Sequence, residues 1–291
     1  MRYTMENEFL TVEADTMAGE LRAVKSKKSG KDYLWTGDPK YWAYCAPPLF
    51  PIVCAAMDDE IRVDGQVYNI SKHGFVRANE FALVEHTKDT MVFELRETPE
   101  TLKMYPYNFI LRFIYKLRGS KVYTTLEAEN VNDRVMHFSI GGHPALNCPF
   151  NPGEAYGDYY LEFDEKETLD AALFDGPYLN GTKRYLVNEN KIPMNHDALR
   201  GTTLIFANYR SAGITLRSSK SDNNVRMNID GFPYVGIWTM TDPDAPYICV
   251  EPWYGIPDIT GYKGELSDKK GVVTLEAGKS FACTYSIEVN E

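Results

Sequence analysis

The sequence predicts an all-β protein, folded as a large antiparallel β-sandwich with few, short helices. Short apolar or alternating runs recur along the whole chain, separated by glycine, asparagine, aspartate or proline. This spacing of turn-forming residues is typical of antiparallel strands joined by turns. The 20 tyrosines and 14 phenylalanines also suit pleated sheets. Because no segment sustains an apolar helical stripe over three turns, we expect little helix.

The strand pattern continues across two turn-rich zones, residues 151–157 and 176–195, so we expect both zones to be long surface loops. A short helix is expected near residues 197–200. No linker or internal repeat interrupts the pattern, and we expect a single domain over residues 1–291. The runs that carry the strand pattern are residues 9–12, 81–84, 91–95, 109–117, 122–128, 159–163, 203–206, 214–216, 234–238 and 281–289.

Charge and composition narrow the possible partners. The chain has 41 acidic and 31 basic residues, a formal net charge of −10, which disfavours nucleic acid and anionic membranes. The first 20 residues lack an apolar run of signal-peptide length, and no later run approaches a membrane span. The five cysteines are odd in number and form no CxxC pair, as in proteins with reduced thiols. We expect a cytoplasmic monomer or homodimer that binds a small molecule.

Three stretches set a titratable side chain among glycine, proline and aromatic residues. His143 follows two glycines and precedes a proline, which indicates a rigid turn that presents one imidazole. His73 precedes Gly-Phe in a similar setting. Glu251 ends an apolar run and enters a Pro-Trp-Tyr-Gly turn, where partial desolvation raises a carboxyl pKa and favours a general base. The structural alternatives are a buried histidine bonded to a backbone carbonyl and a glutamate in a strand-end salt bridge.

These stretches belong to four motifs that occur in order along the chain: His-Gly-Phe-Val-Arg at 73–77, Ile-Gly-Gly-His-Pro-Ala at 140–145, Gly-Phe-Pro-Tyr-Val-Gly-Ile-Trp at 231–238 and Glu-Pro-Trp-Tyr-Gly at 251–255. Their order and spacing resemble those of the aldose 1-epimerase (galactose mutarotase) family, and most closely its LacX-like branch. Residues 32–42 and 48–52 extend the resemblance over nearly the whole chain. It implies the β-supersandwich of the galactose mutarotase-like fold.

The resemblance implies an isomerase that interconverts the α and β anomers of a free aldohexose. This reaction removes a proton from the anomeric hydroxyl and protonates the ring oxygen, so it requires one base and one acid but no metal or other cofactor. Glu251 is implied as the base, His143 as the acid and His73 as a ligand of the sugar hydroxyls.

The same resemblance implies further contacts with the sugar. Asp230, which precedes the Gly-Phe-Pro motif, is the candidate hydroxyl acceptor by position, although an aspartate that caps a turn fits equally well. Trp253 is the main candidate for an aromatic face against the sugar ring. Further aromatic candidates are Tyr254, Phe232 and Trp238. For Phe232 and Trp238, a position in the core is at least as plausible.

One departure from the family pattern concerns an arginine. Family members commonly carry a sugar-binding arginine shortly after a Phe-Pro-Ile segment, whereas residues 50–57 contain none and the next arginine is Arg62. Losing a charge-assisted hydrogen bond costs about 1.5–3 kcal/mol of binding. Arg77 is the candidate replacement, and its alternative is a surface arginine paired with Glu80.

Four alternative functions remain open at this point. A hexose-6-phosphate 1-epimerase would clamp a phosphate with Lys72 and Arg77, although no basic cluster or phosphate loop accompanies them. A glycosidase would pair Glu251 with Asp230 or Asp258. A zinc site would use His73, His137 and His143, whose spacing matches no known ligand pattern. A sugar-binding protein that does not catalyse would explain the missing arginine.

Overall fold

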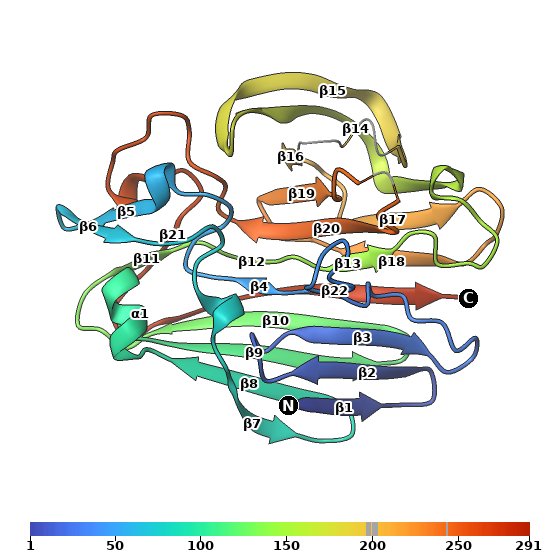
Figure 1. Ribbon diagram of the computed structural model, residues 1–291, viewed down its shortest axis with the longest axis horizontal. Helices are drawn as coiled ribbons and strands as arrows, with labels where there is room; N and C mark the ends of the chain where they lie inside the picture. Colours follow the sequence, from blue (N-terminus) through green and yellow to red (C-terminus); the bar gives the residue numbers. More distant parts are fainter. Residues whose placement is uncertain (196–198, 200–202, 243) are drawn as a thin grey trace.

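The computed structural model describes residues 1–195, 199, 203–242 and 244–291, and the predicted all-β fold with few, short helices is confirmed (Figure 1). Residues 197, 198 and 200 of the expected short helix lie outside the described residues. Over these ranges no helix combines the length and apolar character needed to cross a bilayer. The helical segments in these ranges are α1 Pro99–Met104 and the 3-10 turns η1 Met57–Asp59, η2 Val76–Ala78, η3 Tyr156–Asp158 and η4 Leu266–Asp268.

Nine strands form the larger sheet, in the spatial order β15 (Tyr178–Pro193), β14 (Tyr159–Asp175), β17 (Gly213–Ser218), β18 (Asn224–Asn228), β22 (Ser280–Asn290), β10 (Lys121–Asn130), β9 (Phe109–Arg118), β8 (Thr90–Arg96) and β7 (Ala82–His86). All neighbouring strands in this sheet are antiparallel. Buried and half-buried side chains alternate along β10, as expected when one face of a sheet covers the core.

The second sheet contains the strands β16 (Leu204–Ala207), β19 (Tyr234–Trp238), β20 (Tyr247–Tyr254), β12 (Ile140–Gly142) and β4 (Pro48–Leu49), with β13 (Ala145–Asn147) also paired to β20. Ile248 and Val250 of β20 share a buried cluster with Leu111 of β9, so the two large sheets pack face to face. Because side chains alternate along a strand, Cys249 and Glu251 of β20 lie on the opposite face, away from this shared core.

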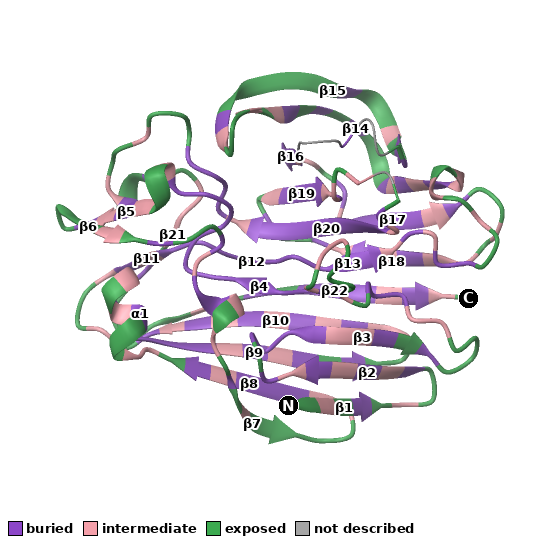
Figure 2. Ribbon diagram, viewed as in Figure 1, coloured by how far each residue is buried: buried purple, intermediate pink, exposed green. Residues whose placement is uncertain are grey.

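Three small sheets complete the molecule. They are a three-stranded sheet of β1 (Arg2–Glu6), β2 (Leu10–Asp15) and β3 (Leu21–Ser26), and two pairs, β5 (Glu60–Val63) with β6 (Gln66–Asn69) and β11 (Met136–Phe138) with β21 (Val273–Leu275). Figure 2 shows buried residues along both large sheets. The rings of Phe75, Phe109 and Phe138 each contact the ring of Phe50.

The prediction of a surface loop over residues 176–195 is wrong. Most of this stretch is β15, which pairs with β14 to form a long hairpin that arches over β16 and β19 (Figure 1). Most side chains of β15 are exposed, as Figure 2 shows in green. The strand therefore lacks the apolar alternation that identifies a half-buried strand in a sequence.

Candidate active site

The outer face of the second sheet carries Glu251 in the middle of β20, where only 1% of the residue is exposed. Its register partner on β19 is Gly236. A Cβ added at Gly236 would lie 2.5 Å from Cη2 of Trp253, and one added at Gly141 on β12 would lie 2.5 Å from Cδ1 of the same indole. The glycines of two neighbouring strands thus make room for Trp253, which lies two residues after Glu251.

His143 lies in the link between β12 and β13 and is 6% exposed. Its Nε2 atom is 3.0 Å from Oε2 of Glu251. The two atoms are close but not aligned as a hydrogen bond, and both Oε2 of Glu251 and Nδ1 of His143 are buried without a hydrogen-bond partner in the described part of the chain. Such unsatisfied buried groups are rare in proteins and often mark sites that a ligand completes.

His73 is held by a reciprocal contact with Cys54. The Cys54 N–H donates to Nδ1 of His73 at 3.1 Å, and the His73 N–H donates to the Cys54 carbonyl at 2.9 Å. Because a backbone N–H can only donate, Nδ1 is an acceptor and the proton of the neutral ring is on Nε2. Both residues have left-handed backbones, with φ of 59° at Cys54 and 67° at His73, a costly conformation that concentrates at functional sites.

Electrostatics favour the uncharged forms of all three titratable groups. Burial raises the pKa of Glu251 well above its usual value, although Lys72 and Arg77 oppose the change. Burial lowers the pKa of His143 well below its usual value, and the positive charges of Arg77 and Lys72 lower it further. The pKa of His73 is lowered mainly by burial. Burial therefore favours a neutral imidazole at His143 and a protonated carboxyl at Glu251.

Tryptophans form much of the wall around these groups. The Trp42 ring lies 4.7 Å from the His143 ring between centroids, and the Trp238 ring lies 5.6 Å from it. The His73 and His143 rings are 5.5 Å apart in an edge-on arrangement. The pocket that they line has a volume of about 220 Å³, below the roughly 300–1,000 Å³ of pockets for drug-sized ligands. It has room for one small ring with polar substituents.

Two cations, Lys72 and Arg77, also line the pocket. The Arg77 guanidinium donates to the Lys72 carbonyl at 3.0 Å and lies over the Tyr44 ring at 4.9 Å. Neither cation forms an ion pair with the carboxylates that the structure describes. The alternative pairing of Arg77 with Glu80 is not formed, and Glu80 instead accepts a hydrogen bond from Thr16.

The sequence matches a family model described as aldose 1-epimerase over residues 1–286. This chain belongs to the aldose 1-epimerase family. Two curated relatives, the plasmid and chromosomal forms of protein LacX from Lactococcus lactis subsp. lactis, are each 34% identical to it, with 99% of both sequences covered. The resemblance to the LacX-like branch is confirmed.

Solved structures of aldose 1-epimerase relatives share the fold. A galactose mutarotase related enzyme from Lactobacillus acidophilus is 32% identical, with 100% of this chain and 98% of that chain covered and a TM-score of 0.95. A galactose mutarotase-like protein from Lactobacillus casei ATCC 334 is 29% identical over 100% of both chains, with a TM-score of 0.93. The predicted galactose mutarotase-like β-supersandwich is confirmed.

Most of the site residues predicted from the motifs line the pocket of this aldose 1-epimerase family member, but not all of them do. His73, Arg77, His143, Glu251 and Trp253 all line one pocket. In contrast, Asp230 is exposed in the turn between β18 and β19 and does not line that pocket. Among the other aromatic candidates, Trp238 lines the pocket, whereas Phe232 packs against Tyr254 outside it.

Sequence reasoning missed Trp42 and Cys54 as members of the pocket. Trp42 lies about a hundred residues before His143, and no local pattern connects the two. Cys54 lies in the segment after Phe50-Pro51-Ile52, and its backbone N–H donates to His73. The cations of this pocket are Lys72, which directly precedes His73 in the sequence, and Arg77, which follows it by four residues.

The geometry bears on two of the alternative functions. Glu251 is the one carboxylate among the described residues that line the pocket, so no second carboxylate faces it as a glycosidase requires. His137 bonds to Thr274 on the neighbouring β21 and lies outside the pocket, away from His73 and His143. Potential metal ligands within 4.8 Å of one another are found instead at His143, Cys249 and Glu251, but burial raises the pKa of the Cys249 thiol and disfavours the thiolate that a metal needs.

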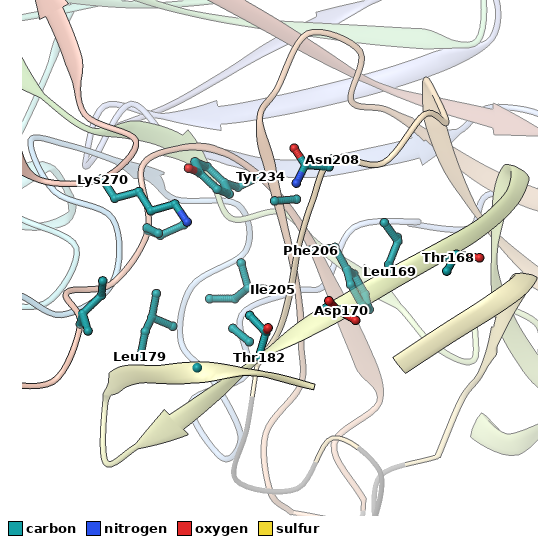
Figure 3. A pocket seen from close by; sticks show the side chains of 15 residues that line it. Thr168, Leu169, Asp170, Leu179, Thr182, Ile205, Phe206, Asn208, Tyr234 and Lys270 are labelled. Atoms are coloured by element: carbon teal, nitrogen blue, oxygen red, sulfur yellow. The ribbon is translucent and has the colours of Figure 1, made fainter. Parts of the chain in front are cut away.

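A larger cavity of about 450 Å³ lies beneath the hairpin of β14 and β15 (Figure 3). Its walls are mixed: Leu169, Ile205 and Phe206 are apolar, Thr182 and Asn208 are polar, and Lys270 lies beside Tyr234 at one side. Asp170, the carboxylate among the described residues that line this cavity, forms an ion pair with Arg184. This cavity has no acid next to a base, so the smaller pocket around Glu251 is the better candidate for catalysis.

Proposed function

We propose that this protein is an aldose 1-epimerase that interconverts the α and β anomers of a free aldohexose. The observation that carries the proposal is the 3.0 Å contact between Nε2 of His143 and Oε2 of Glu251 at the floor of a small pocket lined by aromatic residues. In a pyranose, the anomeric hydroxyl and the ring oxygen are bonded to the same carbon. A base and an acid that act on these two oxygens must therefore lie side by side.

The proposed reaction begins when the carboxyl proton of Glu251 moves to His143, which leaves a carboxylate beside an imidazolium. Glu251 then removes the proton of the anomeric hydroxyl while His143 protonates the ring oxygen, and the bond between that oxygen and the anomeric carbon breaks. The aldehyde rotates, and the hydroxyl attacks its other face. His143 takes back the proton from that hydroxyl and Glu251 returns one to the new anomeric hydroxyl, so the pair is restored.

The other groups in the pocket support this assignment. The Nε2–H of His73 is a fixed donor for a sugar hydroxyl, because Nδ1 is occupied by the Cys54 N–H. The indoles of Trp42, Trp238 and Trp253 offer apolar faces to the C–H groups of a sugar ring. Since all five cysteines are free and buried, we also propose that the enzyme works in the cytoplasm, as a monomer or homodimer.

The test is polarimetry, or NMR saturation transfer, on freshly dissolved α-glucose and α-galactose, with spontaneous mutarotation as the baseline. We expect the wild-type protein to speed the approach to equilibrium and Glu251→Gln to lose about 10²–10⁴-fold in turnover. The matched control is Glu167→Gln, which changes a buried carboxylate on β14 that bonds Ser211 outside the pocket. Sugar binding without any acceleration would show that the protein is a non-catalytic sugar binder.

A second candidate is a hexose-6-phosphate 1-epimerase. It is favoured by the two pocket cations, Lys72 and Arg77, which lack ion pairs with described carboxylates. A phosphate dianion would pair with both of them. The same assay with glucose 6-phosphate and galactose 6-phosphate distinguishes the two candidates: a large preference in kcat/KM for the phosphorylated sugars would replace the free aldohexose as the substrate.

A further inference from the structure

We propose that Asp258 and Lys269 form a positioning pair that fixes the imidazole of His73 relative to Glu251. This inference rests on the proposed function, in which His73 binds the sugar on which Glu251 acts. Neither Asp258 nor Lys269 lines the pocket. Their effect on the reaction must therefore pass through other residues.

The pair is buried beside the pocket. Asp258 is 5% exposed and Lys269 is 6% exposed, and the Lys269 ammonium bonds to Oδ1 of Asp258. The other carboxylate oxygen, Oδ2, accepts the Met57 N–H at 2.7 Å. The Asp258 N–H donates to the Ala55 carbonyl at 3.0 Å. Asp258 thus binds the chain at residues 55–57 with both its backbone and its side chain.

The bound segment leads directly to His73. Ala55 follows Cys54, whose N–H donates to Nδ1 of His73 and whose carbonyl accepts the His73 N–H. Asp258 also lies only seven residues after Glu251, just beyond the end of β20. One carboxylate therefore connects the strand that carries the base to the segment that sets the position and tautomer of His73.

The need for such a connection follows from the backbone of this segment. Cys54 and Asp58 both adopt left-handed φ angles, 59° and 58°, and non-glycine residues keep this conformation only where surrounding contacts impose it. A buried ion pair contributes little net stability because desolvation offsets the attraction. Its value here is geometric: the ammonium holds the Asp258 carboxylate in the orientation that accepts the Met57 N–H.

The test compares two double variants in the full-length protein. Asp258→Ala with Lys269→Met removes the charges and the acceptor, whereas Asp258→Asn with Lys269→Met removes the charges but keeps a side-chain oxygen for the Met57 N–H. We expect the alanine variant to raise KM about 3- to 10-fold, the factor that corresponds to one lost hydrogen bond, with kcat within about twofold. The asparagine variant should restore KM to within about twofold of the wild type.

An NMR readout tests the same proposal without any activity. Long-range ¹H–¹⁵N spectra report the tautomer of His73, and we expect the Nε2–H form in the wild type and asparagine variant but mixed tautomers in the alanine variant. If the wild type does not catalyse mutarotation, the proposed function fails while this spectrum still tests the positioning pair. Wild-type KM and an unchanged His73 spectrum in the alanine variant would overturn the pairing proposal.

Two further variants separate positioning from general loss of stability. Glu167→Ala removes another buried carboxylate that accepts backbone N–H groups, those of Arg210 and Ser211, outside the pocket. It should lower stability without changing KM or the His73 spectrum, and an equal rise in KM would count against the proposal. Should the alanine double variant not fold, Asp258→Glu keeps the charge but displaces the carboxylate, and it should raise KM; an unchanged KM there would overturn the proposal.

Discussion

The indole of Trp253 lies against the backbone of Gly236, so close that a Cβ at Gly236 would be 2.5 Å from Cη2 of the ring. Gly236 is also the residue directly opposite Glu251 on the neighbouring strand. The strand that carries the candidate base therefore fills the space next to that base with its own tryptophan. Only glycine at position 236 permits this arrangement.

Gly236→Ala should destabilise the protein by about 1–3 kcal/mol, the usual cost of inserting a methyl group into a packed site. Urea denaturation gives the free energy of unfolding. The control is Gly157→Ala, since a Cβ at Gly157 would meet nothing within 4 Å, and its effect should stay within about 0.5 kcal/mol. Equal effects of the two substitutions would contradict the packing described for Trp253.

Glu251→Gln should stabilise the fold at alkaline pH while it abolishes most of the activity. Burial raises the folded-state pKa of Glu251, so above about pH 4.5 the unfolded chain loses a proton that the folded protein keeps, and wild-type stability falls until the pH passes the raised pKa. Glutamine has no such proton. We expect a gain of about 0.5–2 kcal/mol at pH 8 that shrinks by pH 5 in urea titrations; a gain independent of pH would contradict the raised pKa.

His73→Asn should raise KM about 3- to 10-fold and leave kcat within a few-fold, because it removes a donor to the sugar but no group that transfers a proton. Asparagine tolerates the left-handed backbone found at this position, so the fold should persist. His86→Asn is the matched control, because His86 is an exposed histidine on β7 that bonds to the Thr4 carbonyl. A large loss of kcat with unchanged KM would assign His73 to the chemistry instead.

Lys72→Met should leave kcat/KM for free glucose and galactose within about twofold, since the neutral sugars offer no anion to this side chain. For hexose 6-phosphates, the second candidate function predicts a loss of about tenfold or more, and the loss should diminish at high salt. Lys116→Met, on the exposed side of β9, serves as the charge-matched control. Equal losses with free and phosphorylated sugars would exclude a phosphate role for Lys72.

Trp42→Ala should raise KM and move the pKa of His143 upward toward its usual value. The Trp42 ring covers the His143 imidazole at 4.7 Å, and burial is the main cause of the lowered pKa. NMR titration of the His143 ring protons measures the change. Trp42→Phe keeps an aromatic cover and should lie closer to the wild type; an alanine variant with an unchanged His143 pKa would show that other groups bury the ring.

The site residues that could be predicted from the sequence are those that lie in short local motifs. Glu251 lies in an apolar strand that enters a proline turn, and the His143 turn carries its own glycines and proline. Trp42 reaches the pocket only through tertiary packing, which no local pattern encodes. Asp230 precedes a motif in the sequence, but it lies exposed in the turn between β18 and β19.

The fold shows the same division between local and long-range information. Buried strands such as β9 and β10 follow from their apolar alternation. The strand β15, whose backbone pairs with β14, has no such alternation, because most of its side chains are exposed and only a few are buried. Because this segment is rich in polar residues, its sequence predicts a loop although it forms a strand.

The hydrogen bond from the Cys54 N–H to His73 determines which sugar analogues this pocket should accept. Since Nδ1 of His73 is already engaged, the ring offers a hydrogen to its ligand and no lone pair. A sugar whose matching hydroxyl is replaced by fluorine still presents an electronegative atom to that hydrogen, whereas the deoxy sugar presents none. Fluorinated sugars are thus the conservative probes of this pocket, and the ranking of fluoro over deoxy analogues would identify which carbon of the ring lies next to His73.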